Sequence, residues 1–401
     1  MLMDDANLFK NITVLSLEQA TVLPYLTLRL AEDGANVIRM EHPVYGDPNR
    51  RVGDNVLNED RMFSYYLSIN AGKKALTLDF AAPEGQKILK ELILKLKVDI
   101  FATNQLPRNY AKLGVEYQML KKIKEDIIWL GMTGFGPTSN EAAYDPVLQA
   151  RGGLMELTGE KGGMPQVMGI PLPDMGASEH GYGLLMRALY KRAVTGEGSR
   201  IDLSMFESTV SWLTQAITHT VTFKKKVSRR GNTHEFFAPV SVYETKDGYA
   251  YVAVGNDKQW ETMTKIPGFE SLYKKEYERN AGRIADVDNL NQAINAITKK
   301  FTTNELIDIF NKATIAISKV NMIEEVVEDP LVKPNLIHSK DPKTGMEITI
   351  APPPLNTSYL KSVNRKLGFP PRFGEHNEEI YNGLLGYSSA QLKEFKEKNL
   401  I

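Results

Sequence analysis

Two aspartates in a stretch rich in glycine and proline are the strongest candidates for chemistry in this sequence. Asp145 follows Tyr144 and precedes a proline, and Asp174 stands between Pro173 and Met175-Gly176, just ahead of a helix that we expect over 181–191. A carboxylate near the start of a helix commonly caps it, which is worth about 1 kcal/mol. It can also act as a nucleophile or as an acid–base group. The residues alone favour a cap for Asp174.

Other patterns that bear on chemistry are weaker. The glycines of Gly131-x-x-Gly134-x-Gly136 follow an expected strand and offer N–H groups to a phosphate, but their spacing is not GxGxxG and favours a plain loop. Ser178 lacks the GxSxG turn that presents a hydrolase nucleophile, and the sequence has no P-loop. No HxxxH or HExxH pair occurs, so no zinc site is predicted from the six histidines: His42, His180, His219, His234, His338 and His376.

Composition excludes several classes of protein. The 401 residues contain no cysteine, which removes disulfides, thiolate metal sites and thiol nucleophiles. Lys plus Arg and Asp plus Glu both number 49, so the chain lacks the basic surplus of a nucleic-acid binder. The longest apolar-rich stretch, residues 87–101, is broken by lysines at helical spacing, and the acidic start Met1–Asp5 is unlike a signal peptide. We therefore expect a cytoplasmic protein with no nucleic-acid or membrane partner.

Alternating strand and helix patterns predict an α/β fold. Strands are expected over 12–17, 37–40, 98–102 and 127–132, with a helix ending at Glu32 and another that begins at Pro83. Short strands that alternate with helices are typical of a parallel, doubly wound sheet.

A second, smaller domain is expected inside the first. The basic run 224–230 marks its start, a hairpin turns at 246–248, amphipathic helices follow from 260 to 327, and a further hairpin is expected over 341–350. We predict a large α/β domain over 1–220 plus 330–401 and a small α+β domain over 221–329.

Six segments resemble one family in the same order along the chain. The chain resembles the class III coenzyme A transferases, the CaiB/BaiF-like group of formyl-CoA transferase and carnitine CoA-transferase. The segments are Pro24 with Gly34-Ala35, Val37-Ile38, Glu41 and Gly46-Asp47; Tyr144-Asp145 with Gln149-Ala150, Gly152 and Asp174; Thr195-Gly196-Glu197-Gly198 through Ser204; Gly231-Asn232-x-His234 with Ala238-Pro239; Asp247-Gly248 with Val254-Gly255-Asn256-Asp257; and Gly374-Glu375-His376-Asn377-Glu378-Glu379 with Leu385-Gly386-Tyr387.

The resemblance implies a CoA-transferase that moves coenzyme A from an acyl-CoA donor to a carboxylic acid through an aspartyl anhydride or thioester. It places Asp174 at the nucleophile position and implies a Rossmann-like large domain within an interlocked homodimer. Coenzyme A would be a substrate rather than a tightly bound cofactor, and no metal is implied. An aspartate of pKa ~3.9 is ionised at pH 7, so this role would need no neighbouring base.

The resemblance also places residues around the substrates. Asp145 aligns with an acidic residue of the acyl pocket. Glycines 152, 153 and 176 flank the site and would let the backbone approach a developing oxyanion. The CoA-contact positions are His42, Leu78, Asn104, Gln105 and Lys112.

Three of the CoA-contact positions depart from the family pattern. The family usually has Arg at 42, an aromatic residue at 105 and Arg at 112. The cations that grip the CoA phosphates are therefore open, and the alternatives are Arg39, Lys73, Lys74 and Arg108.

Three other functions are weighed against this one. An α-methylacyl-CoA racemase of the same family has a His immediately before the acidic residue, whereas Tyr144, with a pKa near ~10, stands here. A non-catalytic subunit of a hetero-oligomer would have no need of Asp174. An NAD-dependent dehydrogenase would need GxGxxG with an acidic residue ~20 positions later, which is absent. The acids exchanged are not readable from the sequence.

Overall fold

The computed structural model describes residues 5–401 and divides the chain into two compact units. The first unit comprises residues up to 152, 168–217 and 330–401, and the second comprises 153–167 and 218–329. The second unit thus takes in residues 153–167, which the sequence pattern alone does not assign to it. Of the acidic start that bears on location, residues 1–4 lie outside the described part.

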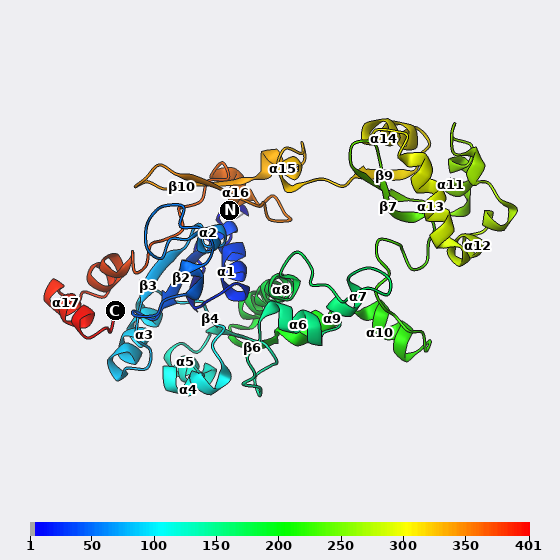
Figure 1. Ribbon diagram of the computed structural model, residues 1–401. Helices are drawn as coiled ribbons and strands as arrows, with labels where there is room; N and C mark the ends of the chain where they lie inside the picture. Colours follow the sequence, from blue (N-terminus) through cyan, green and yellow to red (C-terminus); the bar gives the residue numbers. More distant parts are fainter. Residues whose placement is uncertain (1–4) are drawn as a thin grey trace. The chain divides into compact units, whose positions relative to one another are not determined.

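A six-stranded parallel sheet forms the centre of the first unit (Figure 1), so the predicted α/β class is confirmed. Its strand order is β3-β2-β1-β4-β5-β6, the doubly wound order. The first three strands are added toward one edge of the sheet and the next three toward the other, so the strand order reverses between β1 and β4. The register pairs Val14 of β1 with Val37 of β2 and Ile100 of β4. The strands are β1 (Thr13–Leu17), β2 (Asn36–Glu41), β3 (Lys74–Thr77), β4 (Ile100–Thr103), β5 (Ile128–Thr133) and β6 (Ser199–Ser204).

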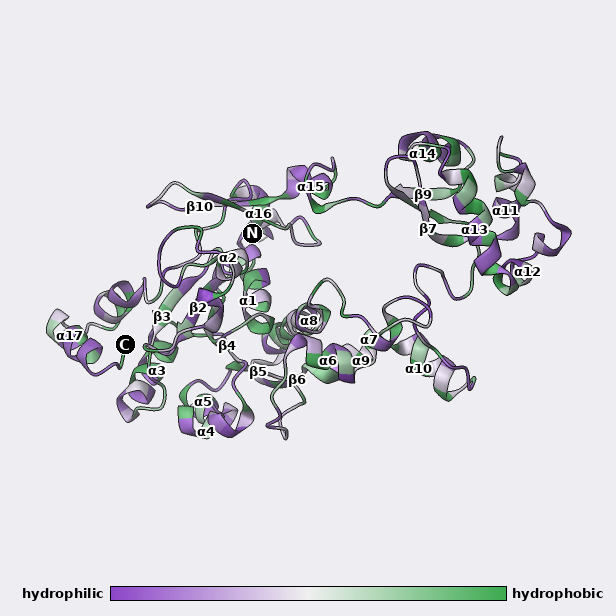
Figure 2. Ribbon diagram, in the orientation of Figure 1, coloured by the Kyte–Doolittle hydropathy of each residue, from purple (hydrophilic) through white to green (hydrophobic). Residues whose placement is uncertain are grey.

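Helices cover both faces of this sheet because successive strand residues point to opposite sides. Val14 packs with α1 (Val22–Glu32) and α8 (Leu172–Thr195), whereas Leu15 belongs to the core on the other face. That second core includes residues of α3 (Pro83–Lys95), α5 (Tyr117–Ile123) and α17 (Ser389–Glu397). The predicted end of α1 at Glu32 and the start of α3 at Pro83 are both confirmed, and Figure 2 shows green, apolar patches on α1.

The C-terminal motif Gly374–Glu379 protects the sheet edge at β3. Asn377 accepts a hydrogen bond from the Thr77 backbone N–H (3.0 Å) and donates one to the Thr77 hydroxyl (2.7 Å). His376 exchanges two further hydrogen bonds with the backbone of Ala75. An exposed strand edge can pair with other chains, so this motif serves the fold.

Shorter elements complete the first unit. The hairpin predicted over 341–350 is present, with strands on either side of a turn at 341–346. The elements are η1 (Asp5–Asn7), η2 (Pro48–Arg51), α2 (Ser64–Ser68), η3 (Pro107–Asn109), α4 (Tyr110–Leu113), α6 (Asp145–Arg151), α9 (Met205–Ser211), η6 (Lys333–Asn335), β10 (Ile337–Lys340), β11 (Glu347–Ile350), α16 (Ser358–Ser362) and η7 (Glu378–Leu384).

The second unit packs helices on a three-stranded antiparallel sheet of order β7-β8-β9. Its hairpin, β7 (Val240–Glu244) with β8 (Tyr249–Ala253), agrees with the predicted turn. β9 (Ala316–Lys319) was predicted as helix, which is wrong: Thr314 has φ +56°, which ends the preceding helix, and the next residues pair with β8. The helices are α7 (Leu154–Leu157), α11 (Asp257–Met263), η4 (Glu270–Leu272), η5 (Lys275–Tyr277), α12 (Asn280–Ala285), α13 (Val287–Thr298), α14 (Thr303–Lys312) and α15 (Ile323–Val326), with α10 (Thr214–Val221) spanning the division between units.

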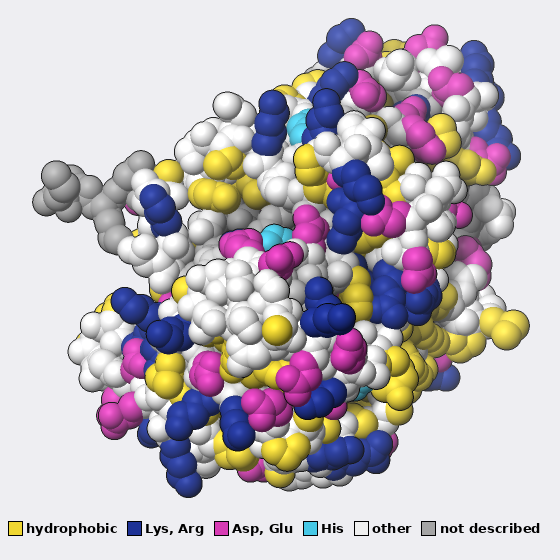
Figure 3. All heavy atoms as spheres, turned by 90° about the vertical axis from the view of Figure 1, so that its left-hand side faces the viewer, with side chains coloured by type: hydrophobic (Ala, Val, Ile, Leu, Met, Phe, Trp, Pro, Cys, Tyr) yellow, Lys and Arg dark blue, Asp and Glu magenta, His cyan; other side chains and the backbone are white. Residues whose placement is uncertain are grey.

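Surface and helix composition bear on partners. Within the described residues, no helix is both long enough and apolar enough to cross a membrane. On the face drawn in Figure 3, basic and acidic side chains are interspersed, in keeping with the formal net charge of zero.

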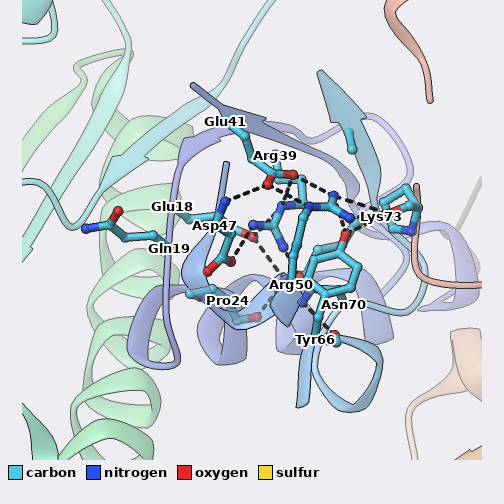
Figure 4. A network of polar contacts seen from close by, with 12 residues as sticks. Glu18, Gln19, Pro24, Arg39, Glu41, Asp47, Arg50, Tyr66, Asn70 and Lys73 are labelled. Atoms are coloured by element: carbon cyan, nitrogen blue, oxygen red, sulfur yellow. Dashed lines mark hydrogen bonds and ion pairs between the residues drawn. The ribbon is translucent and has the colours of Figure 1, made fainter. Parts of the chain in front are cut away.

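Six buried charges lie at the carboxyl ends of β1 and β2 and at the start of β3 (Figure 4). Arg39 lies 2.7 Å from Asp47 and 3.3 Å from Glu41, and Arg50 makes two hydrogen bonds to Glu41, of 2.6 and 2.7 Å. The sixth member, Lys73, lies 3.1 Å from Glu18 and also donates to the Pro24 carbonyl and the Asn70 side chain. Three cations thus offset three carboxylates, which is the condition under which buried charges are tolerated.

Removal of one member of this network should be costly. We expect Lys73→Met to lower the free energy of unfolding by about 3–5 kcal/mol at pH 7, because Glu18 would stay buried with less compensation. The neighbouring Lys74→Met is the matched control. Its ion pair with Glu379 is exposed on both sides and is worth less than about 1 kcal/mol. Urea unfolding of both variants measures the difference, and equal losses would contradict a structural role for the network.

Candidate active site

Helix α8 begins at Leu172, well before the predicted start at 181, so Asp174 lies in its first turn. The Asp174 carboxylate makes no hydrogen bond within residues 5–401, and the helix has no side-chain cap of its own. Instead the Asp145 carboxylate, at the start of α6, accepts the backbone N–H of Asp174 at 3.1 Å. The prediction that Asp174 caps the helix is therefore wrong, because Asp145 does so from another element.

Every backbone N–H in the first turn of α8 is accounted for. Leu172 donates to the Ile170 carbonyl and Met175 to the Pro171 carbonyl, while Pro173 has no N–H to donate. With Asp174 bonded to Asp145, this helix end offers no free donor. An oxyanion donor must come from another part of the chain.

The electrostatics of the pair differ from the sequence expectation. Burial raises the pKa of Asp174 to about 7, and the charge of Asp145 adds to that rise. Burial also raises the pKa of Asp145, while hydrogen bonds from the Gln149 side chain and the Asp174 N–H oppose it. Asp174 was expected to be fully ionised at pH 7; instead both protonation states are present near neutral pH.

The glycines near these aspartates serve close packing. A Cβ on Gly152 would lie 2.7 Å from the Leu148 carbonyl oxygen and 2.8 Å from Thr209, and the Gly152 N–H already bonds that carbonyl. A Cβ on Gly176 would lie 2.9 Å from the indole nitrogen of Trp212. Gly153 has φ +79°, a conformation that glycine adopts without strain.

Ser178 and His180, which follow Asp174 on α8, have structural partners. The Ser178 hydroxyl donates to the backbone carbonyls of Val22 (2.5 Å) and Asp174 (2.8 Å). His180 lies 2.8 Å from the Ser208 hydroxyl and stacks on Trp212 with ring centroids 4.8 Å apart. Neither residue belongs to a triad, in agreement with the absence of GxSxG.

A pocket lies at the carboxyl ends of β1, β2 and β4, where the strand order reverses. Ligands of open α/β sheets bind at such reversals. Two predicted CoA-contact residues, His42 after β2 and Gln105 after β4, line it. The full lining is Leu17, Glu18, Gln19, Met40, Glu41, His42, Gly46, Phe80, Gln105 and Leu113.

Two of the other predicted contacts have different roles. Leu78 is fully buried in the core, so its side chain is not available to a ligand. Asn104 uses its side-chain oxygen and nitrogen on the backbone N–H and carbonyl of Gln19, at 3.1 and 2.7 Å. Lys112, by contrast, is exposed beside Leu113 at the pocket.

The turn after β1 is held entirely by side chains. Besides the two bonds from Asn104, Asp47 accepts the N–H of Ala20 at 3.0 Å, and Asn49 donates to its carbonyl at 2.7 Å. Ala20 has φ +61°, so this strained turn needs such support. A glycine-rich turn at this place would offer N–H groups to a diphosphate; here those of Gln19 and Ala20 are occupied. The sequence gives only a weak signal for these contacts, because Asp47, Asn49 and Asn104 are far from the turn along the chain.

The alternative phosphate cations separate into buried and exposed groups. Arg39 and Lys73 belong to the buried network, so these two predictions are wrong. Lys74 pairs with Glu379. Arg108 lies in η3 and Lys112 in α4, and both are exposed and make no ion pair within residues 5–401.

Comparison with known families decides the class. The family model described as CoA-transferase family III matches residues 9–377, nearly the whole chain. The chain belongs to this family. It is a CoA-transferase, an enzyme whose substrates are CoA thioesters and carboxylic acids.

Individual relatives agree in sequence and in fold. The mouse protein named succinyl-CoA:glutarate CoA-transferase is 29% identical over 97% of this chain and 89% of its own length. The Acetobacter aceti protein named acetyl-CoA:oxalate CoA-transferase is 29% identical over 80% of this chain and 83% of its own. The crystal structure of a CaiB/BaiF family protein from Brucella suis has a TM-score of 0.81 and 28% identity over 94% of this chain and 99% of that one.

The CoA-transferase should show the altered pKa of Asp174 in its stability. The folded state holds a proton on Asp174 up to about pH 7, whereas the unfolded state releases it near pH 3.8, so stability falls as pH rises between these values. The stability gain of Asp174→Asn over the parent should therefore grow from pH 5 to pH 8, by roughly 2 kcal/mol.

Thermal or urea unfolding at the two pH values measures this gain. The exposed Asp54→Asn is the control and should show no such growth. A gain for Asp174→Asn that is the same at both pH values would contradict the raised pKa.

Proposed function

We propose that Asp174 is the nucleophile that carries the acyl group and then coenzyme A between the two acids. One observation supports this role above the others: the Asp174 carboxylate is half-buried and has no hydrogen-bond partner among the described residues, while Asp145 caps its helix. A carboxylate with no structural partner is free to react. The racemase alternative has less support, because Tyr144 is 73% exposed and the named relatives are transferases.

The proposed reaction balances without a cofactor. A carboxylate oxygen of Asp174 attacks the thioester carbonyl and the C–S bond breaks. CoA thiolate departs, and a mixed anhydride of Asp174 and the donor acid is formed. The thiolate attacks the aspartyl carbonyl, which releases the donor acid and forms an aspartyl-CoA thioester. The acceptor carboxylate then attacks the aspartyl carbonyl of this thioester, the C–S bond breaks, and CoA thiolate is expelled as a second mixed anhydride forms. The thiolate attacks the acceptor's carbonyl in that anhydride, which gives the acceptor's CoA thioester and releases the Asp174 carboxylate. The energy of the thioester is kept throughout.

Protonation sets the pH range of the proposed reaction. Only the ionised carboxylate is nucleophilic, so burial, which raises the pKa of Asp174 to about 7, leaves part of the resting enzyme inactive below neutral pH. In return, a poorly solvated carboxylate reacts without first shedding a full hydration shell, and a water-poor site protects the anhydride from hydrolysis.

We propose the pocket at the strand-order reversal as the CoA site. His42 and Gln105 line it, and Arg108 and Lys112 supply unpaired positive charge at the turn that follows β4. Leu78 and Asn104 would act through the fold, the first in the core and the second through the Gln19 turn. Asp145 remains the proposed acidic residue of the acyl pocket.

The proposed acceptor is a small dicarboxylic acid, because two relatives are named for transfer to glutarate or oxalate. Each candidate acyl-CoA donor is incubated with each acceptor acid, and the products are read by mass spectrometry. We expect transfer to at least one dicarboxylate, and Asp174→Asn, which keeps the size of the side chain but cannot form the anhydride, should lose essentially all of it. A folded Asp174→Asn variant that keeps more than a few per cent of the parent rate would overturn the nucleophile assignment.

The phosphate contacts are tested by charge reversal. Lys112→Glu should raise the Kd for CoA by about tenfold at low salt, and the affinity of the parent should fall as salt rises. Lys225→Glu, in the basic run of the second unit, is the matched control with little expected effect. Titration calorimetry at two ionic strengths measures both, and equal effects of the two reversals would remove Lys112 from the site.

We also propose an interlocked homodimer in the cytoplasm. The first unit exposes large apolar side chains along and beside α8, among them Tyr190 (73% exposed), Val194 (66%) and Trp212 (52%), which an interface would cover. Sedimentation at nanomolar concentration should show a dimer, since interlocked chains separate only on unfolding. A monomer under these conditions would contradict the interlocked arrangement.

A further inference from the structure

Gln149 lies at the centre of a hydrogen-bonded relay behind the two aspartates. Its side-chain N–H donates to Asp145 Oδ1 at 2.6 Å, and its side-chain oxygen accepts the backbone N–H of Met168 at 2.9 Å. The other oxygen of Asp145 accepts the N–H of Asp174. The Gln149 side chain is 1% exposed, so it makes these contacts without competition from water.

The geometry of the relay restrains Asp145 from two sides. Asp145 and Gln149 are four residues apart on α6, a spacing that places both side chains on one face of the helix. Met168 belongs to the segment that leads into α8, so the amide of Gln149 joins α6 to the approach to Asp174. The amide can donate and accept at once, which neither an apolar side chain nor an ionised carboxylate can do.

We propose that Gln149 is a positioning residue for the transferase reaction: it holds Asp145 as an oriented carboxylate against the helix end that carries Asp174. Through Asp145 it sets how readily Asp174 gives up its proton. This inference rests on the proposed role of Asp174. It deepens that role, because it assigns the control of the nucleophile to a residue that touches neither substrate nor reacting atoms.

Among residues 5–401, no charged group other than Asp145 contributes to the raised pKa of Asp174. Burial and Asp145 are the causes of the raised Asp174 pKa, and the titratable groups on the elements packed against α6 and α8 have other partners or no part in the shift. They are Tyr25, Arg29 and Glu32 on α1, Glu179, His180, Tyr182, Arg187, Tyr190, Lys191 and Arg192 on α8, Glu207 on α9, Arg200 and Asp202 on β6, and Arg151 on α6.

Substitution of Gln149 should shift the pH profile. Gln149→Met removes the donor that favours the charged form of Asp145, so Asp145 takes up a proton more readily. The acid limb of kcat/KM should then move to lower pH, by about half a unit or more, with a lower kcat and little change in KM for the donor.

The controls separate this inference from the proposed function. Gln118→Met, on the exposed side of α5, should leave the profile unchanged. The same shifts are measured without turnover, as the pH at which the stability gain from Asp174→Asn levels off in each Gln149 background, because that upper limit follows the pKa of Asp174 in the folded state. Folded Gln149 variants that leave both readouts unmoved would overturn the positioning role. If the stability readout moves but the rate profile does not, the relay stands and the nucleophile assignment fails.

Discussion

One hydrogen bond determines what the candidate site can do: the Asp145 carboxylate accepts the backbone N–H of Asp174. A helix start needs acceptors for its N–H groups, and Asp174 lies where a carboxylate often fills that need. Because Asp145 fills it from α6, the side chain of Asp174 is left without a structural task. The contact also brings a second negative charge close, which together with burial raises the pKa of Asp174 to about 7. The same interaction thus frees the proposed nucleophile and limits the pH range in which it reacts.

A second constraint lies under the proposed CoA pocket. Balanced buried charges join the carboxyl ends of β1 and β2 to the residue before β3, and they occupy Arg39 and Lys73, which are thereby removed from ligand binding. Asp47 belongs to this network and also accepts the N–H of Ala20, so the network is linked directly to the turn after β1. The doubly wound strand order is that of dinucleotide-binding folds, but the backbone N–H groups of Gln19 and Ala20 are already bonded. Phosphate binding then falls to exposed cations such as Lys112.

Much of the fold follows from local patterns in the sequence, whereas the site depends on contacts between distant residues. The end of α1 at Glu32 and the start of α3 at Pro83 are signalled by neighbouring residues, and both are predicted correctly. β9 is missed because four residues on a sheet edge carry too little periodicity. The fate of Arg39 and Asn104 depends on partners such as Asp47 and Gln19, which no spacing reveals. Asp174 is identified as the candidate nucleophile only by family resemblance, because a lone aspartate near a helix start is typical of a helix cap.

The most direct test of the central claim is to trap the intermediate on Asp174. The parent enzyme is incubated with an acyl-CoA donor that it is shown to use and with no acceptor, and is then treated with hydroxylamine or borohydride. An anhydride or thioester is far more electrophilic than a resting carboxylate, so only an activated side chain reacts under mild conditions. We predict a hydroxamate or an alcohol at Asp174, detected in the tryptic peptide that spans residues 162–187. An active preparation that gives no adduct there, and instead exchanges the α-hydrogen of the substrate with solvent deuterium, would contradict the account.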